Sequence, residues 1–369
     1  MARCFLVLSV VTILARGSPL LARMQTKQWP ANKAFHWAEQ HGWLVGPNFI
    51  PSTAENQLEM WQRATFDSVT IERELAFANK IGINTARVFL HHLAWHEDQI
   101  GFAARLDQFL SIAHKCKIKP MLVLLDDCWD PNPKIGPQKP PIPHVHNSRW
   151  VQSPGLVALY NESYHETLIK PYIQAVLTKF GNDSRVLMWD LYNEPGNTNG
   201  IAYHDPLLKP IKSNILLQKV FAWARQVNPT QPLTSPIWTV FYPAIPTPIQ
   251  QTQINNSDII SFHNYSPLSG FQQVYHRLKS LNRPIFCSEF MARTVGSTFE
   301  AILPFAKQNN ISAINWGWVN GKTQTIYPWD SWTKNYTHPP KIWFHDVLHK
   351  NGTPFDKIET DLITKLVNE

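Results

Sequence analysis

The stretch "VLMWDLYNEPGN", residues 186–197, joins a buried strand to a polar turn. The apolar run Val186–Trp189 is typical of a strand that is covered on both faces, as in a parallel sheet. It leads directly into Asn193, Glu194 and Pro195, which are an amide, a carboxylate and a residue that cannot continue a helix. A strand that ends in a carboxylate, fixed by a proline, indicates that this carboxylate performs chemistry at the strand end.

Runs of this kind recur along the chain and alternate with amphipathic segments. Strands are predicted at Trp43–Phe49, Ile83–Leu90, Lys119–Asp126, Arg185–Tyr192, Pro232–Thr239, Asp258–Asn264, Pro284–Glu289 and Ser312–Trp318. Helices are predicted at Phe66–Lys80, Leu106–Cys116, Leu156–Phe180, Ile211–Val227, Gly270–Leu281 and Ser297–Asn309. This order predicts an α/β fold, a (β/α)8 TIM barrel that forms a single catalytic domain over residues 18–369. An open doubly wound sheet is the alternative, but no glycine-rich phosphate loop follows the first strand.

Three segments depart from the regular alternation. The connection between the fifth and sixth strands is short and rich in proline, so a helix there is doubtful. Residues 129–150 form a long, proline-rich loop after the third strand, and such loops on the carboxyl side of a barrel commonly shape a binding cleft. After the barrel, residues 356–366 predict a last helix.

The N-terminus is typical of a secreted protein. A short basic start precedes the apolar run Phe5–Ala15, and small residues follow up to Gly17, so residues 1–17 are predicted to be a signal peptide. The run is too short to span a bilayer, which makes a membrane anchor the weaker alternative. No membrane partner is expected once this segment is removed.

Cysteine usage argues against a disulfide-stabilised scaffold. Beyond the predicted signal peptide only Cys116, Cys128 and Cys287 remain, which allow one disulfide at most. Cys287 has the same strand parity as Glu289 and is therefore expected to point into the barrel. Glycosylation sequons occur at Asn161, Asn182, Asn255, Asn264, Asn310, Asn335 and Asn351, of which Asn264 is expected to be inaccessible because it follows a strand.

Composition and charge narrow the class of partner. The chain of 369 residues is 44% hydrophobic and 17% charged, which is sufficient for a large core. The formal net charge of +7 comes from Lys and Arg that are scattered rather than clustered, so nucleic acid is not the expected partner. A neutral or acidic polymer fits this charge equally well, and a monomer is expected.

The active site of a barrel lies where the strands end, so the polar residues at the strand ends are the candidates. They are Asn48, Arg87, His91, His92, Asp126, Asp127, Asn193, Glu194, His263, Tyr265, Glu289 and Trp316. Glu194 and Glu289 end opposed strands, and a pair of carboxylates across a cleft is what glycosidic cleavage requires. Arg87 beside one of them would favour the charged form, whereas a less solvated acid would keep its proton.

These residues resemble the signature of glycoside hydrolase family 5, the cellulase-like family of clan A. The resemblance covers Trp43–Trp318 and rests on Arg87, the "NEP" of strand four, the "HNY" of strand six, the "SEF" of strand seven and the tryptophan of strand eight. A lone "NEP" is a weak signal, whereas six strand-end matches in the right order are specific.

The resemblance implies a role for each matching residue in a retaining double displacement. Glu194 would be the acid/base and Glu289 the nucleophile. Asn193 would bind the sugar 2-hydroxyl, His263 would lie near the acid/base, and Trp316 would stack on a sugar face. Tyr265 and Arg87 would flank Glu289, and Asn48 would support the site. No metal and no cofactor are implied.

The end of strand three departs from the family pattern. Many members have a histidine there, but this chain has Asp126, Asp127 and Trp129. The corner formed by Asp126 and Asp127 suggests a polar contact with a sugar hydroxyl, and Trp129 and Trp238 are further candidate sugar platforms. This departure leaves the catalytic pair untouched, but the substrate stays open among β-linked glycans of the glucan, mannan or xylan type.

Several alternatives remain open from the sequence. An exo-acting β-glycosidase on oligosaccharides or glycoconjugates, a transglycosylase and a carbohydrate-binding barrel without turnover share the same fold. The run "HHLAWHE" places His92 and His96 on one helical face, which suggests a metal site, but no third ligand is evident. The main expectation is a secreted retaining β-glycosidase whose partner is a poly- or oligosaccharide.

Overall fold

The computed structural model describes residues 28–198, 200, 202–239 and 245–369, and the predicted signal peptide lies outside the described residues. The strands are β1 (Val45–Pro47), β2 (Thr85–Phe89), β3 (Lys119–Val123), β4 (Met188–Asp190), β5 (Leu233–Thr234), β6 (Ile260–His263), β7 (Ile285–Phe290) and β8 (Ser312–Asn315). Each lies within or beside a predicted strand. Most are shorter than predicted, because the last polar residues of each run leave the ladder to reach the site.

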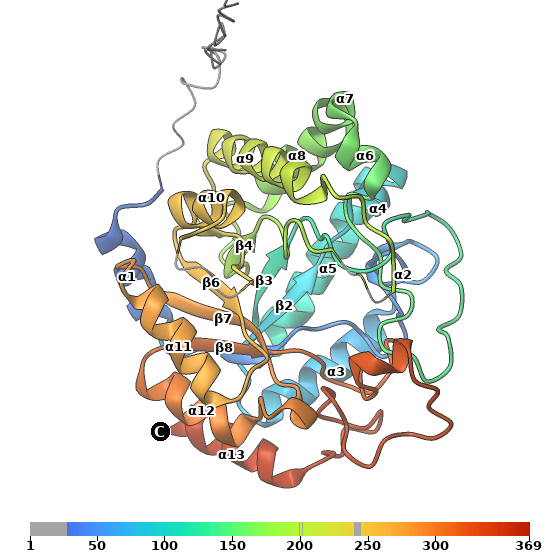
Figure 1. Ribbon diagram of the computed structural model, residues 1–369, viewed down its shortest axis with the longest axis vertical. Helices are drawn as coiled ribbons and strands as arrows, with labels where there is room; N and C mark the ends of the chain where they lie inside the picture. The colour runs from blue at the N-terminus through green and yellow to red at the C-terminus, as the bar shows by residue number, and fades with distance from the viewer. Residues whose placement is uncertain (1–27, 199, 201, 240–244) are drawn as a thin grey trace, which may run out of the picture.

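The strands form two parallel sheets that close on each other. The sheets have the orders β2-β3-β4-β5 and β1-β8-β7-β6. A parallel bridge between Asn48 and Arg87 joins β1 to β2, and one between Ile237 and Phe262 joins the segment after β5 to β6. The eight strands thus form the ring of a (β/α)8 barrel, surrounded by helices as Figure 1 shows.

The α-helices are α1 (Ala31–His41), α2 (Gln57–Trp61), α3 (Ser68–Lys80), α4 (His92–Glu97), α5 (Gln99–Lys115), α6 (Leu156–Tyr160), α7 (Glu162–Tyr164), α8 (Lys170–Phe180), α9 (Lys209–Val227), α10 (Pro248–Asn256), α11 (Leu268–Lys279), α12 (Phe299–Gln308) and α13 (Lys357–Asn368). The π-helix η2 (His165–Ile169) joins α7 to α8, and the 3-10 helices η3 (Arg293–Val295) and η4 (Trp329–Trp332) lie in loops. The predicted last helix is confirmed as α13. Among the helices described, none is long and apolar enough to cross a membrane.

The doubt about a helix between the fifth and sixth strands was wrong. Helix α10 forms there because Thr247 and Gln250 make a capping box and Pro248 occupies the first turn, where its missing N–H costs nothing. The proline-rich sequence therefore starts the helix instead of preventing it.

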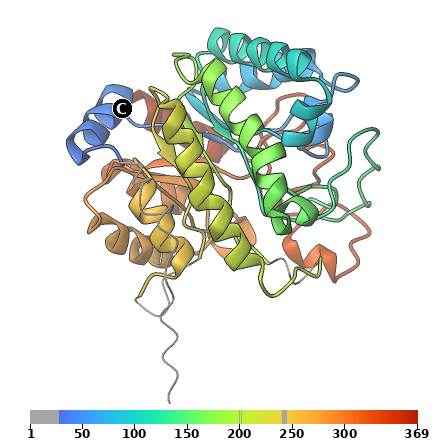
Figure 2. The same cartoon turned by 90° about the horizontal axis from the view of Figure 1, so that it is seen from above.

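The core has an inner and an outer layer. Inside the barrel floor, Met121, Met188, Phe286 and Ile314 pack together, and α1 covers this end of the barrel with Ala34. Outside the ring, the opposite faces of the strands pack against the helices (Figures 1 and 2).

The expectation that Cys287 points into the barrel was wrong. Cys287 pairs with Phe262 and Ala313, and all three belong to the outer layer. The register shifts between Cys287 and Phe290, so this β-bulge restores Glu289 to the inner face. Strict alternation along the strand cannot reveal such a bulge. Cys287, Cys116 and Cys128 are all free thiols.

Candidate active site

The loops at the carboxyl ends of the strands surround a cleft of about 700 Å³. The predicted site residues that line it are Trp129, Asn193, Glu194, His263, Tyr265, Glu289 and Trp316, and Trp238 lines it as well. The predicted long loop after β3 contributes Trp129 and His146 to the lining, so it does shape the cleft. Arg87 and Asp127 lie beneath the cleft surface, and Asn48 lies beside it.

Glu289 is held by two donors on the floor of the cleft. Its Oε1 accepts a hydrogen bond of 2.7 Å from Nη1 of Arg87, and its Oε2 accepts one of 2.7 Å from the hydroxyl of Tyr265. The β-bulge of β7 directs this carboxylate to the inner face. One oxygen is thus fixed by a cation and the other by a neutral hydroxyl.

Arg87 uses all five of its N–H groups within the site. Nε and Nη2 bind Oδ2 of Asp190 at 3.0 and 2.7 Å, and Nη2 also binds Oδ1 of Asn193 at 2.6 Å. Nη1 binds Oδ1 of Asn48 at 2.9 Å in addition to Glu289. The guanidinium is fully buried, and although burial opposes its charge, Asp190 and Glu289 raise its pKa. Arg87 therefore remains a cation, and Asn48 supports it rather than lining the catalytic cleft.

Glu194 contacts only neutral donors. Its Oε1 lies 2.7 Å from Nδ1 of His263, and its Oε2 accepts hydrogen bonds from Nδ2 of Asn197 at 2.5 Å and from the thiol of Cys128 at 3.1 Å. Burial lowers the pKa of His263 to about 3, so its ring is neutral. Glu194 itself has φ +43°, in the left-handed region that a non-glycine residue rarely adopts.

The strained turn after Glu194 is held from below by Asp127. Its Oδ2 accepts hydrogen bonds from the backbone N–H of Gly196 at 2.6 Å and from the hydroxyl of Ser213 at 2.5 Å. Its Oδ1 accepts one of 2.6 Å from the hydroxyl of Tyr192. The expected contact of Asp127 with a sugar hydroxyl is wrong in this structure, because its side chain is fully buried and occupied by protein donors.

Asp126 is likewise a support beneath the cleft. It accepts hydrogen bonds from Nδ2 of Asn193 at 2.9 Å, Nε1 of Trp150 at 2.7 Å and Nε2 of Gln57 at 3.0 Å. Asn193 is thereby fixed between Asp126 and Arg87. The two aspartates that replace the family histidine therefore orient other side chains.

The two glutamates lie close together but in different electrostatic surroundings. One carboxylate oxygen of each and a ring nitrogen of His263 lie within 4.8 Å of one another. Burial raises the pKa of both carboxyls. For Glu289, the neighbouring carboxyl of Glu194 adds to this rise, whereas His263, Arg87 and Tyr265 oppose it; for Glu194, Cys128 and Asn197 oppose it. Because only Glu289 contacts the Arg87 cation directly, Arg87 favours the charged form of Glu289.

The same three residues have the ligand types of a metal site. However, Nδ1 of His263 is already engaged with Glu194, and Arg87 places a positive charge against Glu289. The arrangement therefore favours proton transfer between carboxyls and substrate over binding of a second cation. The histidine pair suggested by the sequence is engaged elsewhere: Nδ1 of His92 lies 2.8 Å from Oγ of Ser153, and Nε2 of His96 lies 2.8 Å from the carbonyl of Leu168.

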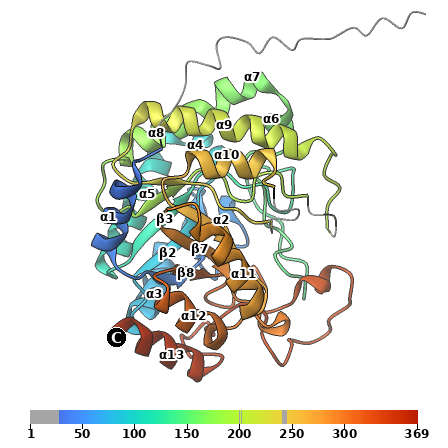
Figure 3. The same ribbon diagram turned by 60° about the vertical axis from the view of Figure 1, so that its left-hand side comes forward.

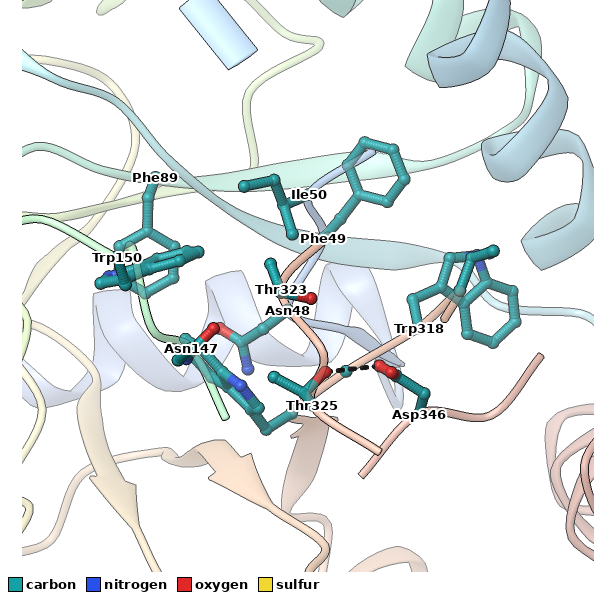
Figure 4. A pocket seen from close by; sticks show the side chains of 13 residues that line it. Asn48, Phe49, Ile50, Phe89, Asn147, Trp150, Trp318, Thr323, Thr325 and Asp346 are labelled. Carbon is teal, nitrogen blue, oxygen red and sulfur yellow. Dashed lines mark hydrogen bonds between the residues drawn. The ribbon is translucent and has the colours of Figure 1, made fainter. Parts of the chain in front are cut away.

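Aromatic rings form much of the cleft wall. Trp129, Trp238, Trp316 and Trp329 all line it, and such rings offer apolar faces to sugar rings. Trp316 also lines a separate cavity of about 20 Å³, which Figure 4 shows together with another of its lining residues, Asn48. This space suits about one water molecule and is too small for a sugar.

Sequence reasoning missed Cys128, Asn197, Asp190 and Trp329. Asp190 and Asn197 belong to the quoted stretch 186–197, and an acid directly after the apolar run Val186–Trp189 is a signal that the sequence offers. Cys128 was considered only for disulfides, because no pattern links residue 128 to residue 194. Trp329 lies far beyond β8, and only the fold brings it to the cleft.

Comparison with known proteins identifies the family. The model for "Cellulase (glycosyl hydrolase family 5)" matches residues 61–322. None of the curated protein sequences compared with the chain matches it.

Solved structures show the same fold at low sequence identity. An endo-β-1,4-mannanase from Thermotoga petrophila is 11% identical with a TM-score of 0.58, and the match covers 90% of this chain and 77% of that chain. A GH5-4 broad-specificity endoglucanase from Clostridium longisporum is 13% identical with a TM-score of 0.55, covering 91% and 98%. GH5_18 from Streptomyces cattleya, in complex with GlcNAc, is 11% identical with a TM-score of 0.57, covering 89% and 80%. With a family model spanning most of a chain whose strand ends carry two opposed glutamates, the protein belongs to glycosyl hydrolase family 5 and is an O-glycosyl hydrolase.

Proposed function

We propose that Glu194 is the acid/base and Glu289 the nucleophile of a retaining hydrolysis of β-linked glycans. The observation that carries this proposal is the separation of the two carboxylates, which have oxygens within 4.8 Å of each other. Retaining glycosidases have carboxyl groups about 5–5.5 Å apart, whereas inverting enzymes need about 6.5–9.5 Å to admit a water. The spacing thus supports direct attack by a carboxylate.

The first step forms a glycosyl ester. An oxygen of ionised Glu289 attacks the anomeric carbon while the bond from that carbon to the glycosidic oxygen breaks. The proton of Glu194 passes to the departing oxygen, which leaves as the alcohol of the remaining sugar. Arg87 and Tyr265 support this step because they hold Glu289 in its charged form before attack.

The second step restores the enzyme. Glu194, now a carboxylate, removes a proton from a water molecule whose oxygen attacks the anomeric carbon, and the ester bond to Glu289 breaks. The neutral ring of His263 contacts Glu194 in both charge states without adding a competing charge. Asn193, fixed between Arg87 and Asp126, is placed to bind the 2-hydroxyl of the reacting sugar.

The substrate follows from the shape and chemistry of the cleft. A site of about 700 Å³ with four tryptophans in its lining suits a few stacked sugar rings. Since the structural neighbours include a mannanase and an endoglucanase, β-1,4-linked mannose and glucose oligosaccharides are the first substrates to test. We also propose that the protein is secreted, on the strength of its N-terminal sequence.

Proton NMR of freshly released sugar tests the proposed mechanism. A retaining enzyme should release the β-anomer first, followed by slow mutarotation. Initial appearance of the α-anomer would contradict it, because a single inverting displacement would then operate. A protein that binds oligosaccharides without releasing any sugar would support the rival, a carbohydrate-binding barrel.

A further inference from the structure

Two long loops of the barrel are joined to each other at many points. The β3 loop, residues 127–155, and the β8 loop, residues 316–347, lie next to each other in Figures 2 and 3. Backbone N–H of Asn147 donates to the carbonyl of Thr323 at 2.8 Å, and the ring of Trp129 stacks on that of Trp332 with centroids 5.5 Å apart and an angle of 17°.

Side chains add further bonds between these loops. Nδ1 of His146 lies 2.8 Å from the carbonyl of Tyr327, and Nδ1 of His144 lies 2.5 Å from its hydroxyl. Gln324 accepts a hydrogen bond of 2.8 Å from the backbone N–H of His144 and donates one of 2.7 Å to the carbonyl of Ile142. Connections of this number and variety make the two loops one rigid wall rather than two independent flaps.

The order of the strands around the barrel shows where this wall lies. Strands β1 and β2 lie between β8 and β3 in the barrel, so contacts between the β3 and β8 loops pass over the ends of β1 and β2. Trp129 and His146 from one loop and Trp329 from the other line the cleft, which makes the wall a boundary of the site. Tyr203, from the loop after β4, packs edge-on against Trp332 at 5.7 Å and extends the wall.

The wall lies on the side of the reacting sugar. In the proposed mechanism the attacked sugar would stack on Trp316, which follows β8 and lines the cleft together with Glu289, the partner of Arg87 of β2. The leaving group would then lie beyond Glu194, toward the loop after β5, where Trp238 donates a hydrogen bond of 3.3 Å to the carbonyl of Pro195. A glycan extending from the reacting sugar away from the leaving group therefore meets the wall.

We propose that this wall restricts the enzyme to the non-reducing ends of its glycans, from which it releases single sugars. The proposal rests on the proposed roles of Glu194 and Glu289, since these define the side of the leaving group. Internal sugars of a polymer are excluded because the chain cannot continue through the bonded loops. Trp332, which touches both Trp129 and Tyr203, is the residue of the wall with the widest contact across loops.

Pentasaccharides of β-1,4-linked mannose, glucose and xylose, each carrying a fluorescent label at the reducing end, test this directly. For the sugar that is cleaved, the expected first products are the labelled tetrasaccharide and free monosaccharide, followed by labelled fragments that shorten by one unit at a time. Labelled di- or trisaccharide among the first products would overturn the proposal. A retained β-anomer together with such internal cleavage would leave the catalytic roles standing, so the two failures are distinguishable.

The variant Trp332→Ala tests the wall itself, with Lys341→Ala as an exposed control in the same loop. Trp332→Ala is expected to raise the ratio of polysaccharide to trisaccharide activity several-fold and to introduce internal products. The control should leave both unchanged. An equal loss of both activities in Trp332→Ala would mean a purely structural role and would count against the wall. Even if this variant fails to fold, the order in which the unaltered enzyme releases labelled products from the pentasaccharides tests the proposal.

Discussion

The chemistry of the site depends on two glutamates with unlike neighbours. Glu289 contacts the buried cation Arg87, whereas Glu194 contacts a neutral histidine, an amide and a thiol. This difference favours a charged Glu289 beside Arg87 and a protonated Glu194, as the proposed roles of nucleophile and acid/base require.

The loss of activity on removal of the proton donor Glu194 should depend on the leaving group of the substrate. Glu194→Ala is expected to lower kcat/KM by about 10²–10⁴-fold on natural glycans, because protonation of the departing oxygen is lost. With a dinitrophenyl glycoside, whose leaving group needs no proton, the loss should be much smaller, and added azide should give a β-glycosyl azide. An equal loss on both substrates would argue against an acid/base role.

Cys128 should tune the acid/base through its contact of 3.1 Å. A donor to the carboxylate lowers the pKa of Glu194, so Cys128→Ala should raise this pKa and move the basic limb of the kcat/KM profile to higher pH. Cys128→Ser supplies a stronger O–H donor and should move the same limb to lower pH. The sign follows because the enzyme is active only while Glu194 is protonated. Identical basic limbs in both variants would show that the thiol does not act on Glu194.

At the scale of the element, the turn 194–197 depends on a carboxylate from the loop after β3. Asp127 accepts hydrogen bonds from the backbone N–H of Gly196, in the turn, and from the hydroxyl of Tyr192, which lies between β4 and the turn. Gly196 has φ +79°, and a Cβ there would lie 2.8 Å from Cδ1 of Ile249, so only glycine fits.

Asp127→Asn should therefore impair both stability and turnover. The amide cannot accept from all three donors, and each buried donor left unpaired costs about 1–3 kcal/mol. We expect a lower midpoint in urea unfolding and a fall in kcat with little change in KM, because the geometry of Glu194 relaxes. Asp361→Asn, on an exposed face of α13, is the control and should change stability by less than about 0.5 kcal/mol. If Asp127→Asn instead raised KM and left kcat unchanged, the result would favour a direct contact between Asp127 and the sugar.

At the scale of the whole molecule, the barrel closes where β1 approaches β2. A Cβ added to Gly46 would lie 1.8 Å from the carbonyl oxygen of Thr85, so the two strands come together only over a glycine. This contact also positions Asn48 and Arg87, which form the bridge between the two sheets.

Gly46→Ala should weaken the contact between β1 and β2 that closes the barrel. We expect a loss of about 1–3 kcal/mol in the free energy of unfolding, as for other overpacked positions, measured by urea denaturation. Gly200→Ala is the matched control, because nothing lies within 4 Å of its added Cβ. Equal stability of the two variants would mean that β1 can shift without cost.

The strand order and the meeting of Glu194 and Glu289 in one cleft could be predicted from the sequence, because apolar runs ending in polar residues are local patterns. The β-bulge beside Glu289, the buried position of Asp127 and the contact of Cys128 with Glu194 could not. Each depends on register or on loops that meet only after the ring has closed. The wall between the β3 and β8 loops could not be predicted either, because its contacting residues lie more than 170 residues apart in the sequence.

The central claim is that Glu289 becomes covalently attached to the substrate. Activated 2-deoxy-2-fluoro-β-glycosides of glucose, mannose and xylose should trap this ester, and peptide mass spectrometry should locate the sugar on Glu289, with the fastest label naming the preferred sugar. A label on Glu194, or no label alongside measurable hydrolysis of the unfluorinated glycosides, would contradict the account.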